Sequence, residues 1–333
     1  MTDKLLKLVL TAQSVNISIT IDAEETERLE MSLDIFTGVF TRPELQDWNG
    51  LGLAVQAYQK RAAAVIRWLA ALAKEYRRKI PLRLVKGAYW DSEIKRAQEQ
   101  GLSNFPVFTH KAATDISYLA CAQLILSETE AFYPQFATHN AHTIAAIHEL
   151  AIGHPGYEFQ RLHGMGESLY AEIVEHHPWE IPCRIYAPVG CYQDLLPYLV
   201  RRLLENGANT SFISQIDKPE IPIEKVISDP VSYWYEQEAT PPQRIPLPRD
   251  LYGKRRMNSR GMNFGDPDLI ADLQQNLDNL AELDWQAYPL IDGRPCPGDP
   301  RPVANPFDYQ RQVGNVTYAD GVWIEKAIES AYR

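Results

Sequence analysis

Six short apolar segments alternate with helical patterns along the first two-thirds of the chain, and this rhythm constrains the fold more than any other feature. The candidate strands are Asn16–Asp22, Leu51–Tyr58, Leu82–Tyr89, Gln135–Asn140, Tyr157–His163 and Cys183–Val189. Each contains β-branched or aromatic residues and ends in a polar or glycine-bearing turn. Apolar residues then recur at helical spacing, as from Leu29 to Phe40. Because parallel neighbours need crossover connections, these repeated units predict a parallel α/β sheet.

Polar residues inside the candidate strands help to choose between two architectures, a doubly wound open sheet and a closed barrel of eight units. Gln56, Arg83 and Gln160 interrupt segments that are otherwise apolar. A barrel with a ligand at its mouth accommodates such residues better than a dry sheet face does. We therefore predict a (β/α)8-type barrel that lacks its first two strands, with the missing units preceding Met1.

The character of the chain changes beyond Ser211. Seven prolines lie between Pro219 and Pro248, a density that prevents long helices and central strands. A helix is predicted over Pro267–Leu283, a second proline-rich stretch follows, and Tyr318–Arg333 is typical of a strand end and a first helix. The predicted organisation is therefore a barrel over residues 1–215, an arm or linker over 216–302, and the start of a further domain over 303–333.

Composition excludes several classes of function. The net charge of −10 argues against a nonspecific nucleic-acid binder, which needs a basic face. No apolar run reaches the ~18 residues of a membrane span, and the start is too broken by lysines for a signal peptide. The four cysteines form no CxxC pair, which predicts reduced thiols and a cytoplasmic location.

The helix predicted over Tyr192–Asn206 has two contrasting faces. An apolar stripe follows Tyr192, Leu195, Leu196, Leu199 and Leu203. The opposite face carries Tyr198, Arg201, Arg202 and Glu205 at spacings that make them surface neighbours. Two adjacent guanidinium groups suit a clamp on a carboxylate or phosphate. The alternative is a solvated face in which arginine pairs with Glu205 near the helix C-terminus.

Polar residues at two strand ends are further candidates. Lys86, Tyr89 and Trp90 could supply charge and stacking surface beside Gly87, which would let a ligand approach the backbone. The alternative is a surface lysine with two core aromatic residues. Asp22 ends the first strand, and we expect it to open a helix containing Glu24 and Glu25. It is either a capping residue or a site carboxylate, since catalytic residues of barrels lie at strand C-termini.

His139 and His142 form a weak metal-ligand pattern that Asp22 and His163 could join. An HxxH spacing is common by chance, and a histidine near a strand end is more often a hydrogen-bonding core residue. The sequence contains no HExxH, GxSxG, P-loop or GxGxxG motif. A bound dinucleotide would therefore need a fold other than the Rossmann fold.

Seven ordered segments of the chain resemble the proline dehydrogenase domain of the bifunctional proline utilization A (PutA) flavoenzymes. They are residues 20–25 (TIDAEE), 57–60 (AYQK), 83–91 (RLVKGAYWD), 136–140 (FATHN), 162–167 (LHGMGE), 184–190 (RIYAPVG) and 198–209 (YLVRRLLENGAN). Residues 245–252 (IPLPRDLY) resemble the family's linker. Residues 303–333 resemble the opening of its glutamate-semialdehyde dehydrogenase half.

The resemblance implies a distorted barrel that holds FAD and oxidises L-proline to Δ1-pyrroline-5-carboxylate. Arg201 and Arg202 would clamp the substrate carboxylate. Tyr89, Tyr186, Tyr198 and Leu162 would wall the pyrrolidine ring, and Asp22 would close the site. Arg83 would lie by the flavin N5, so that Arg83, Asp22 and Tyr89 are the expected catalytic residues. The remaining expected cofactor contacts are Gln56, Val85, Lys86, Gly87, Ala88, Trp90, Thr109, His110, Lys111, Thr138, His139, Asn140, Gln160 and Glu205.

The resemblance also sets expectations about partners. It implies a quinone or membrane electron acceptor at the bilayer surface, hence a cytoplasmic protein peripheral to the inner membrane, and it is compatible with a homo-oligomer. NAD would serve only the aldehyde dehydrogenase half. The family's first two strands supply a glutamate and a lysine that have no counterpart before Asn16, so we expect weak flavin binding and low activity by this chain alone. Two alternatives stay open: a metal-dependent barrel hydrolase that uses Asp22, Lys86, His139 and His163, and a non-catalytic fragment.

Overall fold

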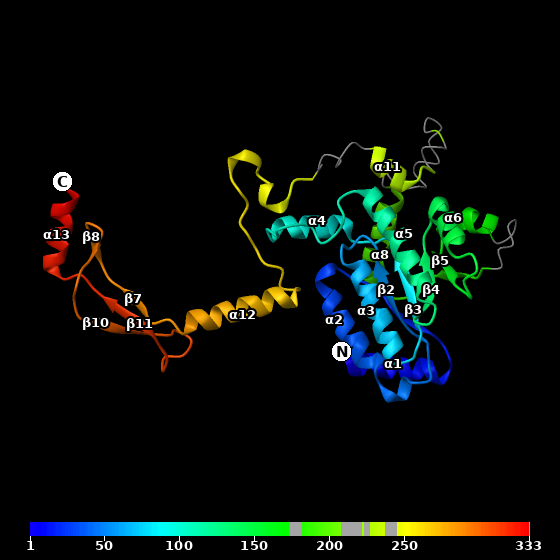
Figure 1. Cartoon of the computed structure of the whole chain (residues 1–333), viewed down its shortest axis with the longest axis horizontal. Helices are drawn as coiled ribbons and strands as arrows, with labels where there is room; N and C mark the ends of the chain where they lie inside the picture. The colour runs from blue at the N-terminus through cyan, green and yellow to red at the C-terminus, as the bar shows by residue number, and fades with distance from the viewer. Residues whose placement is uncertain (174–180, 208–221, 223–226, 237–244, 333) are drawn as a thin grey trace. The chain divides into compact units, whose positions relative to one another are not determined.

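The structure is a computed structural model that describes residues 1–173, 181–207, 222, 227–236 and 245–332. Two compact units make up the chain, Met1–Gly265 and Asp266–Arg333. The first unit contains the parallel sheet and is where the candidate site lies (Figure 1). Among the described residues, no helix is both long enough and apolar enough to cross a bilayer.

The sheet of the first unit contains a strand in each of the six predicted segments. The strands are β1 (Ile19–Ile21), β2 (Leu51–Gln56), β3 (Ile80–Val85), β4 (Phe132–Ala137), β5 (Glu158–Leu162) and β6 (Cys183–Tyr186). They pair in parallel and in chain order from β1 to β6. A doubly wound sheet reverses its strand order at a switch point, and this sheet does not. The order confirms the barrel-type prediction, here as a half-barrel of six strands.

Helices lie before, between and after the strands, and several of them pack against one face of the sheet. They are α1 (Thr2–Ser14), α2 (Leu29–Phe40), α3 (Ala62–Glu75), α4 (Trp90–Glu99), α5 (Lys111–Ser127), α6 (Ala141–Leu150), α7 (Glu167–Ala171), α8 (Tyr192–Gly207) and α11 (Pro230–Glu236). Short 3-10 helices span Thr26–Arg28, Pro43–Leu45, Pro248–Asp250 and Gly253–Arg255. Helix α1 was not predicted, although it buries Val9 and Ala12. Its lysines obscure the helical spacing of its apolar residues.

Strand alternation divides the sheet into two faces. On the helix-covered face, Leu53, Leu84, Phe136 and Phe159 join one core with side chains of α3, α5 and α6. The other face, here called the polar face, carries Gln56, Arg83, Gln135, Glu158 and Gln160, of which all but Arg83 are fully buried. The polar residues noted in the sequence therefore share one face and follow one another across β2, β3, β4 and β5.

The chain leaves the sheet earlier than the sequence predicted. Strand β3 ends at Val85, and Gly87 has φ of +133°. A Cβ at Gly87 would lie 2.5 Å from ring atoms of Tyr58, so packing alone already requires glycine there, and the predicted ligand approach stays a prediction. The expected helical turn at Glu24 and Glu25 is wrong. Glu25 is extended, with φ −60° and ψ 153°, because the Gln56 amide holds the Glu24 carbonyl at 2.8 Å.

The described part of the predicted arm contributes to the first unit. Ile245 and Leu247 pack against a small core that includes Ile94 and Phe105. The Asn258 amide donates to the carbonyl oxygen of Gln98 at 3.0 Å. The prolines predicted to break structure at 219, 241 and 242 lie outside the described residues. The predicted domain boundaries after residues 215 and 302 stay predictions.

The second unit, by contrast, is mostly exposed. It contains α12 (Pro267–Ala281), β7 (Trp285–Ala287), β8 (Leu290–Ile291), β9 (Arg294–Pro295), β10 (Pro300–Ala304), β11 (Gln312–Thr317) and α13 (Gly321–Ala331). The helix predicted over Pro267–Leu283 is confirmed as α12, and the final helix as α13. Strands β7 to β10 were not predicted, because they are only two to five residues long and almost wholly exposed, without an apolar alternation. None of the four cysteines, all of which the structure describes, forms a disulfide, and Cys296 of this unit is buried.

Candidate active site

The carboxyl ends of the parallel strands bring Arg83, Asp22, Gln160 and Tyr186 together. Arg83 Nη1 donates to Asp22 Oδ1 at 2.5 Å, and Arg83 Nε donates to Gln160 Oε1 at 2.7 Å. The guanidinium carbon lies 5.0 Å from the centre of the Tyr186 ring. Only 14% of the Arg83 side chain is exposed, whereas 69% of Asp22 is. The site thus holds a cation that is shielded from water, with its carboxylate partner at the rim.

Glu158 determines how the Gln160 amide is oriented. Gln160 Nε2 donates to Glu158 Oε1 at 2.7 Å, which leaves Gln160 Oε1 to face Arg83. Gln135 donates to the same carboxylate at 2.9 Å, and Arg184 binds both of its oxygens, each at 2.9 Å. Burial alone would raise the pKa of Glu158, but the hydrogen bonds from Arg184 and Gln160 outweigh it and lower that pKa. Sequence reasoning missed Glu158, although it lies two residues before Gln160 and hence on the same strand face.

Tyr89 lies between a carboxylate and a guanidinium group. Its hydroxyl donates to Glu24 Oε2 at 2.7 Å, and the guanidinium carbon of Arg201 lies 4.9 Å from its ring centre. Burial, followed by the contact with Glu24, raises the pKa of the Tyr89 phenol well above its ordinary value. The phenol is therefore a hydrogen-bond donor at neutral pH and not a base.

Helix α8 directs its polar face toward Tyr89. Tyr198 and Arg201 are half-buried, while Leu196 is 57% and Leu199 49% exposed. The solvated-face alternative therefore does not describe Arg201, and of the predicted apolar stripe Tyr192, Leu196 and Leu199 meet solvent. The side chains of Arg202 and Glu205 lie outside the described residues. Pairing of the two arginines on one ligand remains a prediction.

A group of charges lies between the loop after β3 and the start of α5. Asp115 forms ion pairs with both Lys86 and Lys111, the latter at 2.6 Å. Burial acts to raise the pKa of Asp115, but the two ammonium groups lower it overall. Two cations and one anion leave this group with a net positive charge. Asp115 was not predicted, although it follows Lys111 by four residues, one helical turn.

The other predicted cofactor residues, and Leu162 of the predicted substrate pocket, lie around the same sheet edge. Val85 ends β3, Leu162 ends β5, Ala88 follows Gly87, Trp90 begins α4, and Thr109 and His110 precede α5. Trp90 Nε1 donates to the carbonyl oxygen of Phe108 at 2.9 Å and so ties the segment before α5 to α4. The His110 ring meets the Trp234 ring edge-on at 5.9 Å.

The residues between β4 and α6 have defined structural contacts. His139 Nε2 accepts a hydrogen bond from the Leu162 backbone at 3.2 Å, and Asn140 caps α6 by accepting from Thr143 N at 2.9 Å. Thr138 is buried, and its carbonyl oxygen accepts from the Tyr170 hydroxyl at 2.8 Å. Within the described part of the chain, no three His, Cys, Asp or Glu residues converge as a metal site would require. The metal-ligand interpretation of His139 and Asp22 thus lacks a ligand set there.

A half-barrel of parallel strands with charged and aromatic side chains at their carboxyl ends defines an enzyme of the (β/α)8-barrel class. The family model described as Proline dehydrogenase matches residues 4–215. This chain belongs to the proline dehydrogenase family.

Named relatives agree with this assignment. The chain is 49% identical to the Bifunctional protein PutA of Escherichia coli over 98% of its own length and 26% of that protein's. It is 30% identical to Proline dehydrogenase 1 of Bacillus subtilis, over 62% of this chain and 60% of that one. The chain thus spans about a quarter of the length of the PutA relatives.

Solved structures give the same fold. A mutant of Bradyrhizobium japonicum proline utilization A superposes with a TM-score of 0.80 at 50% identity, covering 84% of this chain and 28% of that one. The Bdellovibrio bacteriovorus protein, solved after inactivation by N-propargylglycine, superposes with a TM-score of 0.85 at 27% identity, covering 98% and 34%.

Proposed function

We propose that this chain supplies the site at which FAD oxidises L-proline to Δ1-pyrroline-5-carboxylate, as one part of a bifunctional enzyme of proline catabolism. The observation that carries the proposal is the position of Arg83. Its guanidinium group is shielded at the carboxyl edge of the sheet, held by Asp22 and Gln160 and flanked by Tyr186. A fixed cation in that position stabilises negative charge that develops beside it during a redox reaction.

The residues present fit a flavin dinucleotide. The buried amides of Gln56 and Gln160 match the polar edge of an isoalloxazine ring. The positive charge at Lys86, Lys111 and Asp115 suits the dinucleotide's pyrophosphate. FAD would supply the acceptor for a hydride removed from the carbon next to the proline nitrogen. The chain's own contribution is to bind, orient and shield.

The substrate's carboxylate is the group that Arg201 recognises in this proposal, together with Arg202. Arg201 already lies against the Tyr89 ring, so a ligand carboxylate at that guanidinium group would lie beside an aromatic wall. Tyr186, Tyr198 and Leu162 would supply the other walls of the ring pocket. Because its phenol stays protonated and donates its one O–H to Glu24, Tyr89 would present its ring as a wall of the pocket and would not remove a proton.

The electron acceptor in this proposal is a quinone or another acceptor at the bilayer surface. That assignment places the protein in the cytoplasm and peripheral to the inner membrane. It follows from the family relationship, and a membrane-flotation assay with quinone-containing vesicles tests it separately from the chemistry.

The test of the proposal uses a protein that we call the PutA chimera. It is the Escherichia coli relative with its matching segment replaced by residues 4–215 of this chain. After reconstitution with FAD, anaerobic L-proline should bleach the visible flavin absorbance of the chimera, while D-proline should not. A chimera that retains FAD and is not reduced by L-proline would contradict the proposal. A metal at unit stoichiometry without flavin would favour the hydrolase alternative.

A further inference from the structure

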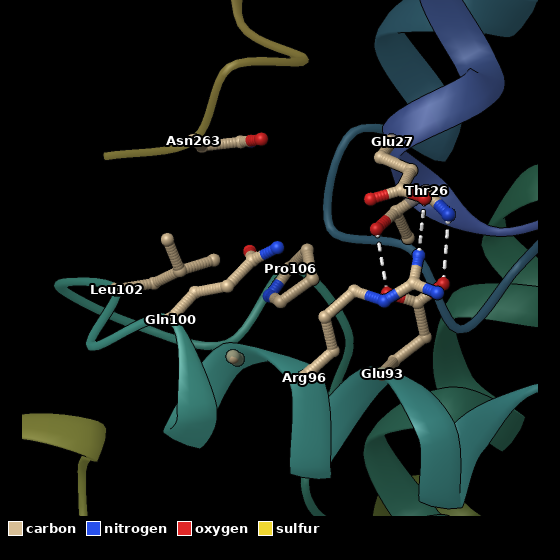
Figure 2. A pocket seen from close by; sticks show the side chains of 9 residues that line it. Thr26, Glu27, Glu93, Arg96, Gln100, Leu102, Pro106 and Asn263 are labelled. Atoms are coloured by element: carbon tan, nitrogen blue, oxygen red, sulfur yellow. Dashed lines mark hydrogen bonds and ion pairs between the residues drawn. The ribbon is translucent and has the colours of Figure 1, made fainter. Parts of the chain in front are cut away.

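A buried carboxylate joins helix α4 to the segment that follows β1. Glu93 is only 2% exposed, and both of its carboxylate oxygens are used. Oε1 accepts from the Thr26 backbone at 2.7 Å, and Oε2 accepts from the Thr26 hydroxyl at 2.6 Å. Figure 2 shows the two hydrogen bonds side by side across the gap between the two segments. We call this pair the Glu93–Thr26 latch.

Neighbouring ion pairs hold the same segment from two sides. Arg96, one turn after Glu93, lies 2.5 Å from Glu27, as Figure 2 also shows. From the start of α3, Arg61 donates to the Thr26 carbonyl oxygen at 2.9 Å and lies 2.6 Å from Glu30. The Thr26 residue therefore has its backbone N–H, hydroxyl and carbonyl all bonded to side chains of other elements.

The latch lies beside a contact of the candidate site. Tyr89 precedes Glu93 by one helical turn, and the Glu93 backbone N–H donates to the Tyr89 carbonyl oxygen at 2.9 Å. On the facing segment, Glu24 precedes Thr26 by two residues, and its carboxylate accepts from the Tyr89 hydroxyl. The two segments are thus joined twice, once at Tyr89 and once at the buried latch.

We propose that Glu93 is a positioning residue that, through Thr26, holds residues 22–25 against Tyr89. This inference rests on the proposed function for its effect on proline. Asp22 is 69% exposed, so burial does not fix its place opposite Arg83, which depends on the backbone that carries it. The latch anchors that backbone on its C-terminal side. An apolar contact there would leave the segment able to rotate or slide against α4. Hydrogen bonds from the Thr26 N–H and hydroxyl to one buried carboxylate prevent both movements.

The test compares Glu93→Ala with Glu99→Ala, a matched control on the same helix whose carboxylate is 65% exposed and lies 3.8 Å from Lys95. Hydrogen–deuterium exchange of the 333-residue chain should be about 10-fold faster over residues 19–30 in Glu93→Ala than in the control. In the flavin-loaded PutA chimera, the same change should raise the KM for L-proline about 10-fold while kcat falls less.

Two further variants keep the test decisive. Thr26→Val removes only the hydroxyl contact and should give a smaller increase in exchange over the same residues, even if Glu93→Ala does not fold. Glu93→Gln keeps one acceptor and should fall between Glu93→Ala and the unmodified chain. Exchange and proline KM of Glu93→Ala and Thr26→Val that both match Glu99→Ala would overturn the inference. If the unmodified chimera is not reduced by proline, the proposed function fails, and the exchange comparison alone decides the inference.

Discussion

The two faces of the six-stranded sheet are built from the same strands but are stabilised in opposite ways. The helix-covered face is apolar, and Phe136, Phe159 and Leu84 are at most 1% exposed there. The polar face is almost as well buried at Gln135, Glu158 and Gln160, but each of these side chains needs hydrogen bonds to be there. Burial alone therefore does not distinguish core from site. The distinguishing feature is whether a buried residue is satisfied by packing or by polar partners.

This difference predicts that damage to the helix-covered face costs stability first. Phe136→Ala should lower the free energy of unfolding by about 3–5 kcal/mol, because it removes a fully buried ring from the core of α5, α6 and the sheet. Urea unfolding followed by circular dichroism measures this. The matched control is Tyr309→Ala, an 80% exposed aromatic residue of the second unit, which should change little. A loss below about 1 kcal/mol for Phe136→Ala would mean that the face is not the core.

Damage to the polar face should cost function more than stability. In the PutA chimera, Arg83→Met should slow flavin reduction by L-proline about 100-fold or more, since the fixed cation at the sheet edge is removed. Its free energy of unfolding should fall by only about 1–2 kcal/mol, because Gln160 loses one partner. Stopped-flow absorbance and urea unfolding give the two numbers. If Arg83→Met were as destabilised as Phe136→Ala, with an unchanged reduction rate, the division between the faces would be wrong.

Glu158 sharpens the comparison of the two sheet faces because it is a buried, charged residue of the polar face. Its pKa is lowered in the folded protein, so its contribution to stability is present above the ordinary value of 4.5 and is lost as the pH falls below it. Glu158→Gln should cost about 1–3 kcal/mol at pH 7. The variant should also lose less stability than the unmodified chain between pH 5 and 3, roughly the window set by the carboxylate's ordinary pKa. Parallel acid-limb slopes in the two proteins would contradict this role.

The smallest expected effect concerns the charged group that Lys86 forms with Lys111 and Asp115 at the start of α5. Asp115→Asn should remove the counter-ion that Lys86 and Lys111 share. We expect the FAD dissociation constant of the chimera to rise about 10-fold, since the lysines are no longer held in one geometry. Fluorescence titration with FAD measures it, and Glu99→Gln, at an exposed pair with Lys95, is the control. Unchanged or tighter FAD binding would show that Asp115 does not organise this group.

The strands and the residues at their ends could be predicted from the sequence because the signals for them are local. Alternation and turn chemistry are local, so all six strands could be placed, and parallel pairing then brings Asp22 and Arg83 to one edge. The partners that hold them are long-range. Gln160 is 77 residues from Arg83 in the chain, and Glu93 is 67 from Thr26. No local pattern indicates such pairs.

Backbone detail was equally beyond local reasoning. Gly87 is required by the ring of Tyr58, about thirty residues earlier, a contact that no local pattern indicates. The extended conformation at Glu25 overrode the preference of acidic residues for a first helical turn, because Gln56 and Glu93 hold the segment from other elements. The short strands of the second unit have no buried alternation to reveal them.

The most direct test of the account asks whether Arg201 recognises the substrate's carboxylate. Dissociation constants of the flavin-loaded chimera are measured for L-proline and for pyrrolidine, which has the same ring without the carboxylate. The unmodified protein should prefer proline, and Arg201→Ala should reduce that preference about 10-fold or more, the value of one charge-assisted hydrogen bond. The control Arg67→Ala, at an exposed arginine of α3, should leave it unchanged. The same preference in Arg201→Ala as in the unmodified protein would contradict the account.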